Sequence, residues 1–218
     1  MFESVTVIGA GRAGSAIAAR LQERGLQLRP DGDLRLLCVP DTAIAEVAAT
    51  IPAGPWVAHV SGATPLAALA PHAHRFSVHP LQTLVRSRGP EQLDGAWAAV
   101  TAETAEAHER ATWLAETLGL TPFDLADDAR GLYHASAVMA SNFLVTLHRA
   151  AARLAVDAGA PPEGLLPLMR RTMENDFELT GPIARGDHAT IERHVAAIRR
   201  REPQLEPLYT ALAEATAP

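Results

Sequence analysis

The sequence predicts an α/β protein in two parts: a doubly wound sheet over residues 1–126, followed by a smaller all-α domain over residues 127–218. Short β-branched or apolar runs alternate with helix-favouring runs up to residue 125. From Ala129 to Pro218 no segment is a good strand candidate, and the apolar residues follow the helical repeat. At the N-terminus, Val5–Gly14 combines a strand, a tight turn and a helix start, which is typical of this class.

In this N-terminal stretch, Gly9, Gly11 and Gly14 have the Gly-x-Gly-x-x-Gly spacing and are followed by the helix-favouring run Ser15–Arg24. Such a turn lets a cofactor's pyrophosphate approach the backbone and the free N–H groups of the helix start. The pattern therefore predicts a bound dinucleotide, contacted also by the intervening Ala10, Arg12 and Ala13. The alternative is a glycine-rich turn that merely joins a strand to a helix.

Further short apolar runs predict the rest of the sheet, with helices at Thr42–Ile51 and Thr104–Leu118. The expected strands are Gly25–Arg29, Leu34–Val39, Trp56–Val60, Phe76–Val78, Ala96–Val100 and Thr121–Leu125. Asp41 or Thr42 is expected to cap the first of these helices, because short polar side chains accept hydrogen bonds from a helix start.

The connection Pro30–Asp33 is too short to contain a crossover helix. The strand before it is therefore either an irregular edge or paired in an unusual way. The adenosine end of a dinucleotide is expected here, where an acid binds the ribose of NAD or an arginine binds the 2′-phosphate of NADP. Arg29 and Arg12 favour NADP, with NAD possible. The alternative is that Arg29 and Asp31 are ordinary solvated turn residues.

Ligands of open α/β sheets lie beyond the carboxyl ends of the strands. We therefore expect several strand-end residues to share one crevice with the glycine turn: Val39, Pro40, Asp41, Ser61, Gly62 and His79. His79 is the best candidate for acid–base catalysis, because an imidazole donates or accepts a proton near neutral pH. A purely structural histidine is the alternative.

Two polar clusters in the helical part are candidates for substrate contacts. His134 and Asn142 lie on one helix face, eight residues apart, with Ser141 adjacent. In the turn Leu179–Asp187, Arg185 is placed to hold a carboxylate, and Asp187 suits the N-cap of the next helix. The alternatives are a helix-surface histidine and a capping turn with a solvated arginine.

The helical run over residues 129–158 predicts a helix of about 45 Å. Its apolar face is hard to cover within one subunit and includes Val138, Phe143, Leu144, Leu147 and Leu154. A homodimer formed through this helix is therefore expected, with a lone helical bundle as the alternative.

Composition restricts the kinds of ligand, cellular location and catalytic group that the sequence can imply. The chain has 218 residues, 48% hydrophobic, with net charge −6 and no broad basic patch, so a small-molecule substrate is expected rather than nucleic acid. No signal peptide or membrane-spanning run is found, so we expect a cytoplasmic protein without a membrane partner. The lone Cys38 is expected in the core, and no zinc site is predicted. All 19 basic residues are arginine, which excludes lysine as the catalytic acid.

Several motifs together resemble one family: GAGRAG, VPD, SGA, SVHPLQT, YHASAVMASN and LTGPIARGD. These are the Rossmann-like proteins with a C-terminal helical domain of unknown function, which are labelled as candidate NADP-dependent oxidoreductases. The resemblance covers nearly the whole chain. It implies a dimer-forming domain similar to that of the 6-phosphogluconate dehydrogenase superfamily.

Wider relatives rank the possible activities. Hydroxyacid dehydrogenases of that superfamily carry a lysine four residues before an asparagine; Asn142 matches the asparagine, but Val138 stands at the lysine position. Prephenate dehydrogenases have a His-Pro motif similar to His79-Pro80. Some similar proteins are ketopantoate reductases, which makes a small 2-oxo acid the leading substrate class.

The sequence thus predicts an NAD(P)H-dependent oxidoreductase in which His79 or His134 donates the proton and Asn142 orients the substrate. Ser141 and Arg185 are expected to bind the substrate. The alternatives are an oxidative, prephenate-type dehydrogenase and a dinucleotide-binding sensor without turnover.

Overall fold

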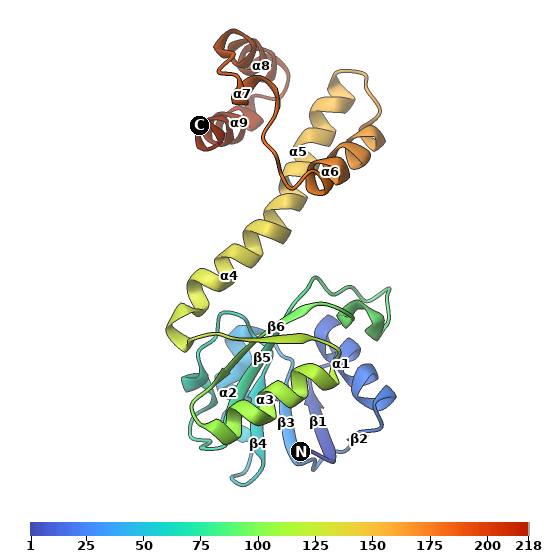
Figure 1. Cartoon of the computed structure of the whole chain (residues 1–218), viewed down its shortest axis with the longest axis vertical. Helices are drawn as coiled ribbons and strands as arrows, with labels where there is room; N and C mark the ends of the chain where they lie inside the picture. The colour runs from blue at the N-terminus through green and yellow to red at the C-terminus, as the bar shows by residue number, and fades with distance from the viewer. Residues whose placement is uncertain (218) are drawn as a thin grey trace. The chain divides into compact units, whose positions relative to one another are not determined.

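A computed structural model describes residues 1–217 (Figure 1). The chain divides into two compact units, Met1–Met139 and Ala140–Pro218. The sequence predicted the second domain to begin at residue 127. The boundary lies later because Asp127, Arg130 and Tyr133 bond to residues of the sheet region.

The first unit is built on a seven-stranded sheet with the strand order β2-β1-β3-β4-β5-β6-β7. All pairs are parallel except β5 with β6. This confirms the predicted α/β class. The strands are β1 Ser4–Ile8, β2 Gln27–Leu28, β3 Leu34–Leu37, β4 Trp56–His59, β5 Arg75–Leu81, β6 Trp97–Ala102 and β7 Thr121–Asp124.

The short connection between β2 and β3 crosses directly over β1. Both strands pair with β1, on opposite sides of it, so the chain must pass from one edge to the other without a helix. Gly32 makes this possible, because a Cβ there would lie only 2.7–2.8 Å from backbone atoms of Val5 and Thr6. The edge strand β2 is accordingly only two residues long.

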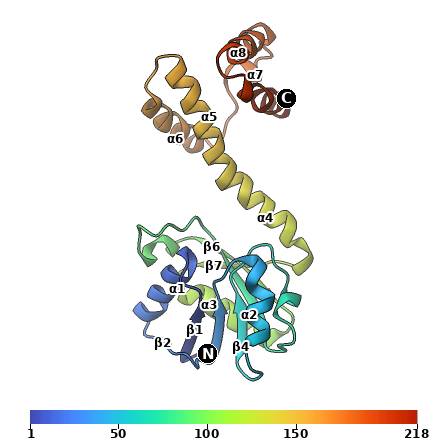
Figure 2. The same ribbon diagram turned by 180° about the vertical axis from the view of Figure 1, so that it is seen from behind.

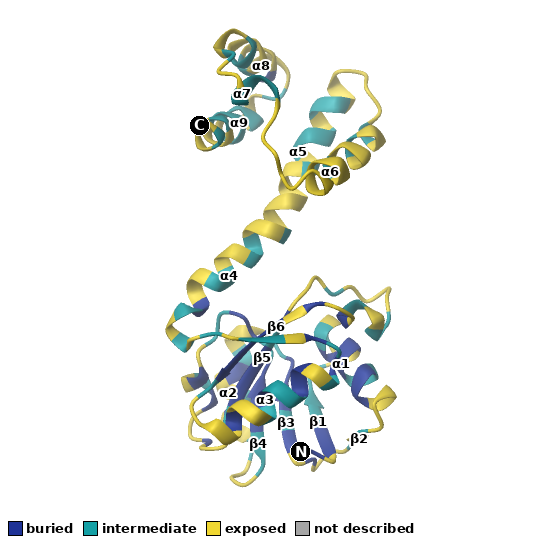
Figure 3. Ribbon diagram, viewed as in Figure 1, coloured by how far each residue is buried: buried dark blue, intermediate teal, exposed yellow. Residues whose placement is uncertain are grey.

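Helices cover both faces of this sheet (Figures 1 and 2). Side chains of α1 (Arg12–Glu23) and α3 (Ala105–Thr117) share one buried cluster with Leu36 and Phe76. On the other face, α2 (Ile44–Thr50) and the 3₁₀ turn η2 (Leu66–Leu69) pack on Leu37 and Val57. Figure 3 shows the central strands β3, β4 and β5 largely buried between these layers.

The predicted cap of α2 was wrong. Asp41 and Thr42 lie in a 3₁₀ turn, η1 (Asp41–Ala43), and α2 begins after it without a side-chain cap. Cys38 is buried, as predicted, and burial raises the pKa of its thiol to about 12.

The segment after β7 is helical. It runs through η4 (Asp127–Ala129), α4 (Arg130–Val138), a π-helical segment at Met139–Phe143 and α5 (Leu144–Asp157). The later elements are η6 Pro162–Gly164, α6 Leu165–Glu174, α7 Gly181–Ala184, α8 His188–Arg201, η7 Pro203–Leu205 and α9 Glu206–Thr216. Asp187 caps α8 as predicted, because its carboxylate accepts the Thr190 N–H at 3.0 Å.

The second unit has almost no core of its own. Ile198 is the one buried hydrophobic side chain among its described residues. Large apolar side chains are exposed instead along Met139–Asp157 and α6 (Figure 3): Phe143, Leu144, Val145, Leu147, Val156, Leu166, Leu168 and Met173.

No helix within residues 1–217 is long and apolar enough to span a membrane. Nor do these residues contain a group of three or more His, Cys, Asp or Glu side chains that could hold a metal ion.

Candidate active site

The glycine turn between β1 and α1 is shaped by close backbone packing. Gly9 has φ 111°, and a Cβ there would lie 2.5 Å from the carbonyl oxygen of Cys38. A Cβ on Gly14 would lie 1.9 Å from the carbonyl oxygen of Gly9. Gly11 differs, because a Cβ there would have no heavy atom within 4 Å. Gly9 and Gly14 are therefore required by the fold, whereas Gly11 presents open backbone.

A cavity of about 460 Å³ adjoins this turn. Gly9, Ala10 and Gly14 line it together with Arg29 and Pro30, so the structure brings these predicted cofactor residues to one place. Arg12 is the first residue of α1, and the first turn of α1 contains no acidic residue. The helix start is thus free of negative side chains that would repel an anion.

A second cluster gathers where β4 and β5 end their pairing. The two strands pair only as far as His59 and Ser77, so β5 continues past β4 and carries His79 beyond it. Gly62 follows β4, and a Cβ there would lie 2.8 Å from Cε1 of His79 and 2.9 Å from Cδ2 of His134. The rings of His79 and His134 lie 6.1 Å apart, centroid to centroid. The predicted residues Gly62, His79 and His134 are therefore neighbours.

His79 has one hydrogen-bond partner that the residue pattern did not predict. Its Nδ1 lies 2.7 Å from the hydroxyl of Tyr133, which is on α4. Burial raises the pKa of Tyr133 to about 12, so this hydroxyl keeps its proton at neutral pH. Tyr133 can therefore donate its proton to Nδ1, which leaves the imidazole proton on Nε2.

The imidazole of His79 is neutral at neutral pH. Its pKa is lowered to about 4, chiefly by burial and in smaller part by the charges of His134 and Arg130, whereas the charge of Asp41 opposes the shift. The predicted role of Asp41 in cofactor binding stays a prediction. Val39 lies at the glycine turn, with its Cγ1 3.3 Å from the position of a Cβ on Gly9.

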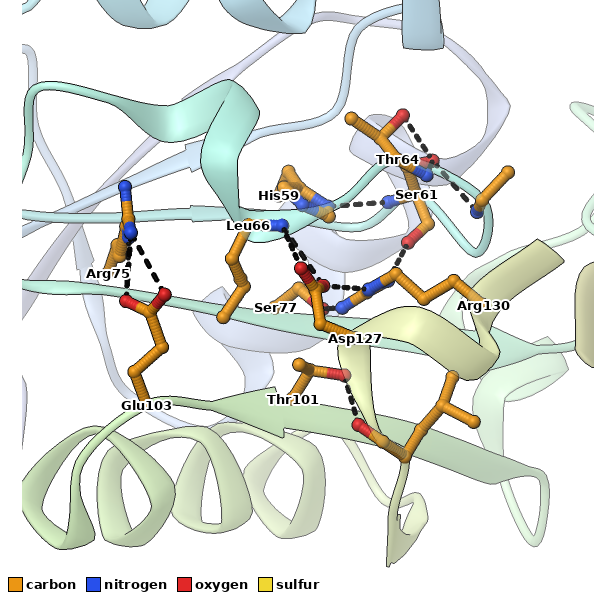
Figure 4. A network of polar contacts seen from close by, with 12 residues as sticks. His59, Ser61, Thr64, Leu66, Arg75, Ser77, Thr101, Glu103, Asp127 and Arg130 are labelled. Carbon is orange, nitrogen blue, oxygen red and sulfur yellow. Dashed lines mark hydrogen bonds and ion pairs between the residues drawn. The ribbon is translucent and has the colours of Figure 1, made fainter.

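Arg130, the first residue of α4, is a buried cation whose contacts Figure 4 shows. Its Nε donates to Asp127 at 2.7 Å and its Nη1 donates to the carbonyl oxygen of Ser61 at 3.0 Å. Its Nη2 donates to the hydroxyl of Ser77. Asp127 in turn accepts the backbone N–H of Leu66 at 3.0 Å. One side chain therefore ties the start of α4 to the chain after β4 and to β5.

His59 is fully buried at the end of β4, beside Arg130 in Figure 4. Its Nδ1 accepts the backbone N–H of Ser61 at 3.2 Å. Burial chiefly, with the nearby charge of Arg130, lowers the pKa of His59 to about 3. A second neutral histidine therefore supports the Ser61–Gly62 turn.

The remaining predicted site residues belong to the second unit. Ser141 and Asn142 lie in the π-helical segment, with Ser141 Oγ 3.3 Å from Asn142 Oδ1. Arg185 is exposed at the end of α7. Their roles in substrate binding stay predictions.

Sequence reasoning missed Tyr133 and Arg130. The available signal was spacing, because Arg130 precedes His134 by one helical turn and so shares its face. An arginine at a helix start is ordinarily solvent-exposed, so its burial and its bonds to Ser61 and Ser77 could not be anticipated.

Residues 96–216, more than half of the chain, match a family described as Domain of unknown function (DUF2520). No curated protein matches the sequence.

Solved structures share the fold. A candidate NADP oxidoreductase from Bacteroides fragilis has a TM-score of 0.83 at 22% identity, covering 98% of this chain and 97% of that one. A Thermotoga maritima protein has a TM-score of 0.77 at 19% identity, covering 97% and 99%. A reductive aminase from Aspergillus terreus, solved with NADPH and ethyl-5-oxohexanoate, has a TM-score of 0.71 at 17% identity, covering 99% and 93%. These likenesses confirm the predicted Rossmann-like fold with a helical C-terminal part.

Proposed function

We propose that this chain, which belongs to the DUF2520 family, is an NAD(P)H-dependent oxidoreductase that acts on a small carbonyl compound. The observation that carries the proposal is the open face of Gly11, at the start of α1 and beside a cavity of about 460 Å³. Backbone N–H groups at such a helix start bind phosphate, and Arg29 lines the same cavity. The residues present therefore fit a dinucleotide, and the arginines favour NADP over NAD.

When bound, a reduced nicotinamide supplies hydride to the carbonyl carbon. The protein's own role is to hold the substrate and to deliver a proton to its oxygen. His79 is the group proposed for this step. Because its imidazole is neutral, the proton that it offers is an N–H proton on Nε2 rather than the acidic proton of an imidazolium.

Tyr133 is proposed to complete the proton path. As Nε2 of His79 gives its proton to the substrate oxygen, Nδ1 takes the proton of the Tyr133 hydroxyl, 2.7 Å away. An alkoxide oxygen is far more basic than a phenolate, so the transfer is downhill even though the Tyr133 pKa is raised to about 12. Solvent then returns a proton to Tyr133.

The proposed substrate class is a small 2-oxo acid, of the kind reduced by ketopantoate reductases. The solved structure of the similarly folded reductive aminase with NADPH supports the reductive direction. Oxidation of a prephenate-type substrate, and a sensor without turnover, are separate outcomes of the test.

The test is a turnover assay with NADPH and a panel of 2-oxo acids, beginning with ketopantoate, for the wild type and for His79→Ala. The proposal expects oxidation of NADPH by the wild type and loss of it in the variant, with NADPH affinity retained. Cofactor binding without turnover of any substrate in either direction would favour the sensor. Turnover that survives His79→Ala would remove His79 from the mechanism.

We also propose that the protein is a homodimer formed through the helical run over residues 129–158. Ile198 alone is buried among the hydrophobic side chains described in the second unit, whereas five large apolar side chains of Phe143–Val156 are exposed. A helical unit without its own core is stabilised by burying such a face against another chain. A second copy is the simplest such chain.

A further inference from the structure

The connection between β5 and β6 is docked on α1, the helix that starts at the glycine turn (Figures 1 and 2). Arg20 of α1 is 4% exposed and donates to Asp94 Oδ1 at 2.6 Å and to the carbonyl oxygen of Pro90 at 2.8 Å. Leu93, in the 3₁₀ turn η3 (Pro90–Leu93), is fully buried in the same cluster as Ile17 of α1. This part of the connection is therefore fixed relative to the glycine turn.

A single amide side chain braces the rest of the loop. Gln92 Oε1 accepts the N–H of Val85 at 2.8 Å. Its Nε2 shares its two N–H groups among the carbonyl oxygens of Val85, Arg88 and Gly89, at 3.2, 3.0 and 2.9 Å. Both ends of the turn Val85–Gly89 are thereby attached to η3, and through η3 to α1.

This braced turn presents Arg86 to the glycine turn. Nη2 of Arg86 donates to the carbonyl oxygen of Ala10 at 3.4 Å, and Ala10 lies between Gly9 and Gly11. A guanidinium has five N–H donors in a planar fork. Within residues 1–217, Ala10 is the only partner of the Arg86 side chain, so most of these donors remain available.

The charge of Arg86 suits a ligand held at this turn. The chain contains no lysine, so any cation near a bound phosphate is a guanidinium. A guanidinium fork pairs with phosphate oxygens through parallel, charge-assisted hydrogen bonds. In a dinucleotide, the group that approaches the glycine turn is the diphosphate, which NAD and NADP have in common.

We propose that Arg86 binds the diphosphate of the cofactor together with the backbone of the glycine turn. This inference rests on the proposed function, and it adds a binding residue from a loop that no sequence motif had marked. The arginines thereby have separate roles, because Arg86 binds the diphosphate, whereas Arg29 and Arg12 are the candidates for the 2′-phosphate.

The test compares Arg86→Ala with Arg88→Ala. Arg88 is an exposed arginine two residues away, and no side-chain partner of it is found in the described part of the chain. Both variants lose one positive charge from the same loop. Dissociation constants for NADPH and for NADH are measured by calorimetry for each variant and for the wild type.

The inference expects Arg86→Ala to raise the dissociation constants of NADPH and NADH by about tenfold or more, because a charge-assisted contact is lost. The factor is expected to be the same for both cofactors. Arg88→Ala is expected to stay within about twofold of the wild type. Equal affinities for the two variants would overturn the inference. Weaker binding of NADPH alone would also overturn the inference, since such a result would assign Arg86 to the 2′-phosphate. If the wild type binds neither cofactor, the proposed function fails and this inference fails with it.

Two further measurements separate binding from a purely structural role. The melting temperature of Arg86→Ala without cofactor is expected to equal that of the wild type, whereas the rise on adding NADPH is smaller. Gln92→Leu keeps the Arg86 side chain but removes the hydrogen bonds that hold its loop, and it is expected to weaken the binding of both cofactors several-fold. A fall in the cofactor-free melting temperature of Arg86→Ala, with affinity unchanged, would show that the contact with Ala10 is structural only.

Discussion

The hydroxyl of Tyr133 lies 2.7 Å from Nδ1 of His79, which joins the first helix after the sheet to the strand that projects past β4. Tyr133→Phe removes this hydroxyl and keeps the ring. Turnover is expected to fall about tenfold, because one hydrogen bond in the proton path is lost. His79→Gln, which removes the proton donor itself, is expected to lower turnover by about a hundredfold or more.

Steady-state kinetics with NADPH checks both values. Ser136→Ala is the matched control, because it removes an exposed hydroxyl of the same helix whose one partner within residues 1–217 is the carbonyl oxygen of Tyr133, at 2.6 Å. If Tyr133→Phe turned over substrate as fast as Ser136→Ala does, the proposed proton path would be contradicted.

The buried charge of Arg130 is expected to support both stability and the state of His79. Arg130→Met removes the cationic partner of Asp127 and leaves the buried Ser61 carbonyl and Ser77 hydroxyl without their donor. The free energy of unfolding should fall by about 3–5 kcal/mol, because each buried polar group left unpaired costs about 1–3 kcal/mol. Because the positive charge of Arg130 lowers the pKa of His79, that pKa should rise in the variant.

Urea denaturation and an NMR titration of the imidazole measure these two effects. Arg75→Met is the matched control, because Arg75 pairs at 2.9 Å with a half-exposed Glu103, also visible in Figure 4. Loss of the Arg75–Glu103 ion pair should lower the free energy of unfolding by at most about 1 kcal/mol. Similar costs for the two variants would show that Arg130 is an ordinary surface cation.

Two neutral histidines make the fold sensitive to acid. The pKa values of His59 and His79 are lowered from 6.5 to about 3 and about 4, so the unfolded chain binds protons first as the pH falls. The free energy of unfolding therefore decreases as the pH falls below 6.5. The fully buried His59 lowers it by about 2.7 kcal/mol over the first two pH units. The partly exposed His79 should lower the free energy of unfolding by less than this.

Melting temperatures measured as a function of pH check this. His59→Asn retains an acceptor for the Ser61 N–H but does not titrate, so its melting temperature should fall less steeply between pH 6.5 and pH about 4. An unchanged pH slope in this variant would mean that His59 is not kept neutral by burial.

The proposed dimer is expected to depend on the exposed apolar face of α5. Val145 is 49% exposed, and Val145→Asp should convert a dimer into a monomer, because a buried carboxylate without a partner is costly at an interface. Val85, in the first unit, is 43% exposed and serves as the matched control. Sedimentation velocity is the measurement. A wild-type monomer at micromolar concentration, or dissociation by both substitutions, would contradict the proposal.

The fold could be predicted from the sequence largely because its signals are local. Gly9, Gly11 and Gly14 mark the turn, and each apolar run from Leu34 to Thr121 forms a strand in the structure. The position of β2 could not be settled in this way. It depends on Gly32 packing against the backbone of β1, a contact between segments distant in sequence.

The site was predicted only in part for the same reason. Gly62 could be placed because it follows a strand end, where ligands of such sheets lie. His79 was expected just after its strand, but it lies within β5, two residues beyond the last residue that pairs with β4. The bonds of Arg130 to Ser61 and Ser77, and the bond between Tyr133 and His79, join residues more than fifty positions apart. Their formation depends on how far β5 extends past β4, and nothing in the residue pattern specifies that length.

The central claim is tested most directly by calorimetric titration of the protein with NADPH, NADH, NADP and NAD, comparing the wild type with Gly11→Asp. A Cβ at Gly11 would have no heavy atom within 4 Å, so this variant should fold normally while placing a carboxylate where phosphate approaches. The account predicts that the wild type binds NADPH more tightly than NADH, and that binding is lost in Gly11→Asp. If none of the four binds the wild type, or if Gly11→Asp binds as well as the wild type, the glycine turn is not a cofactor site.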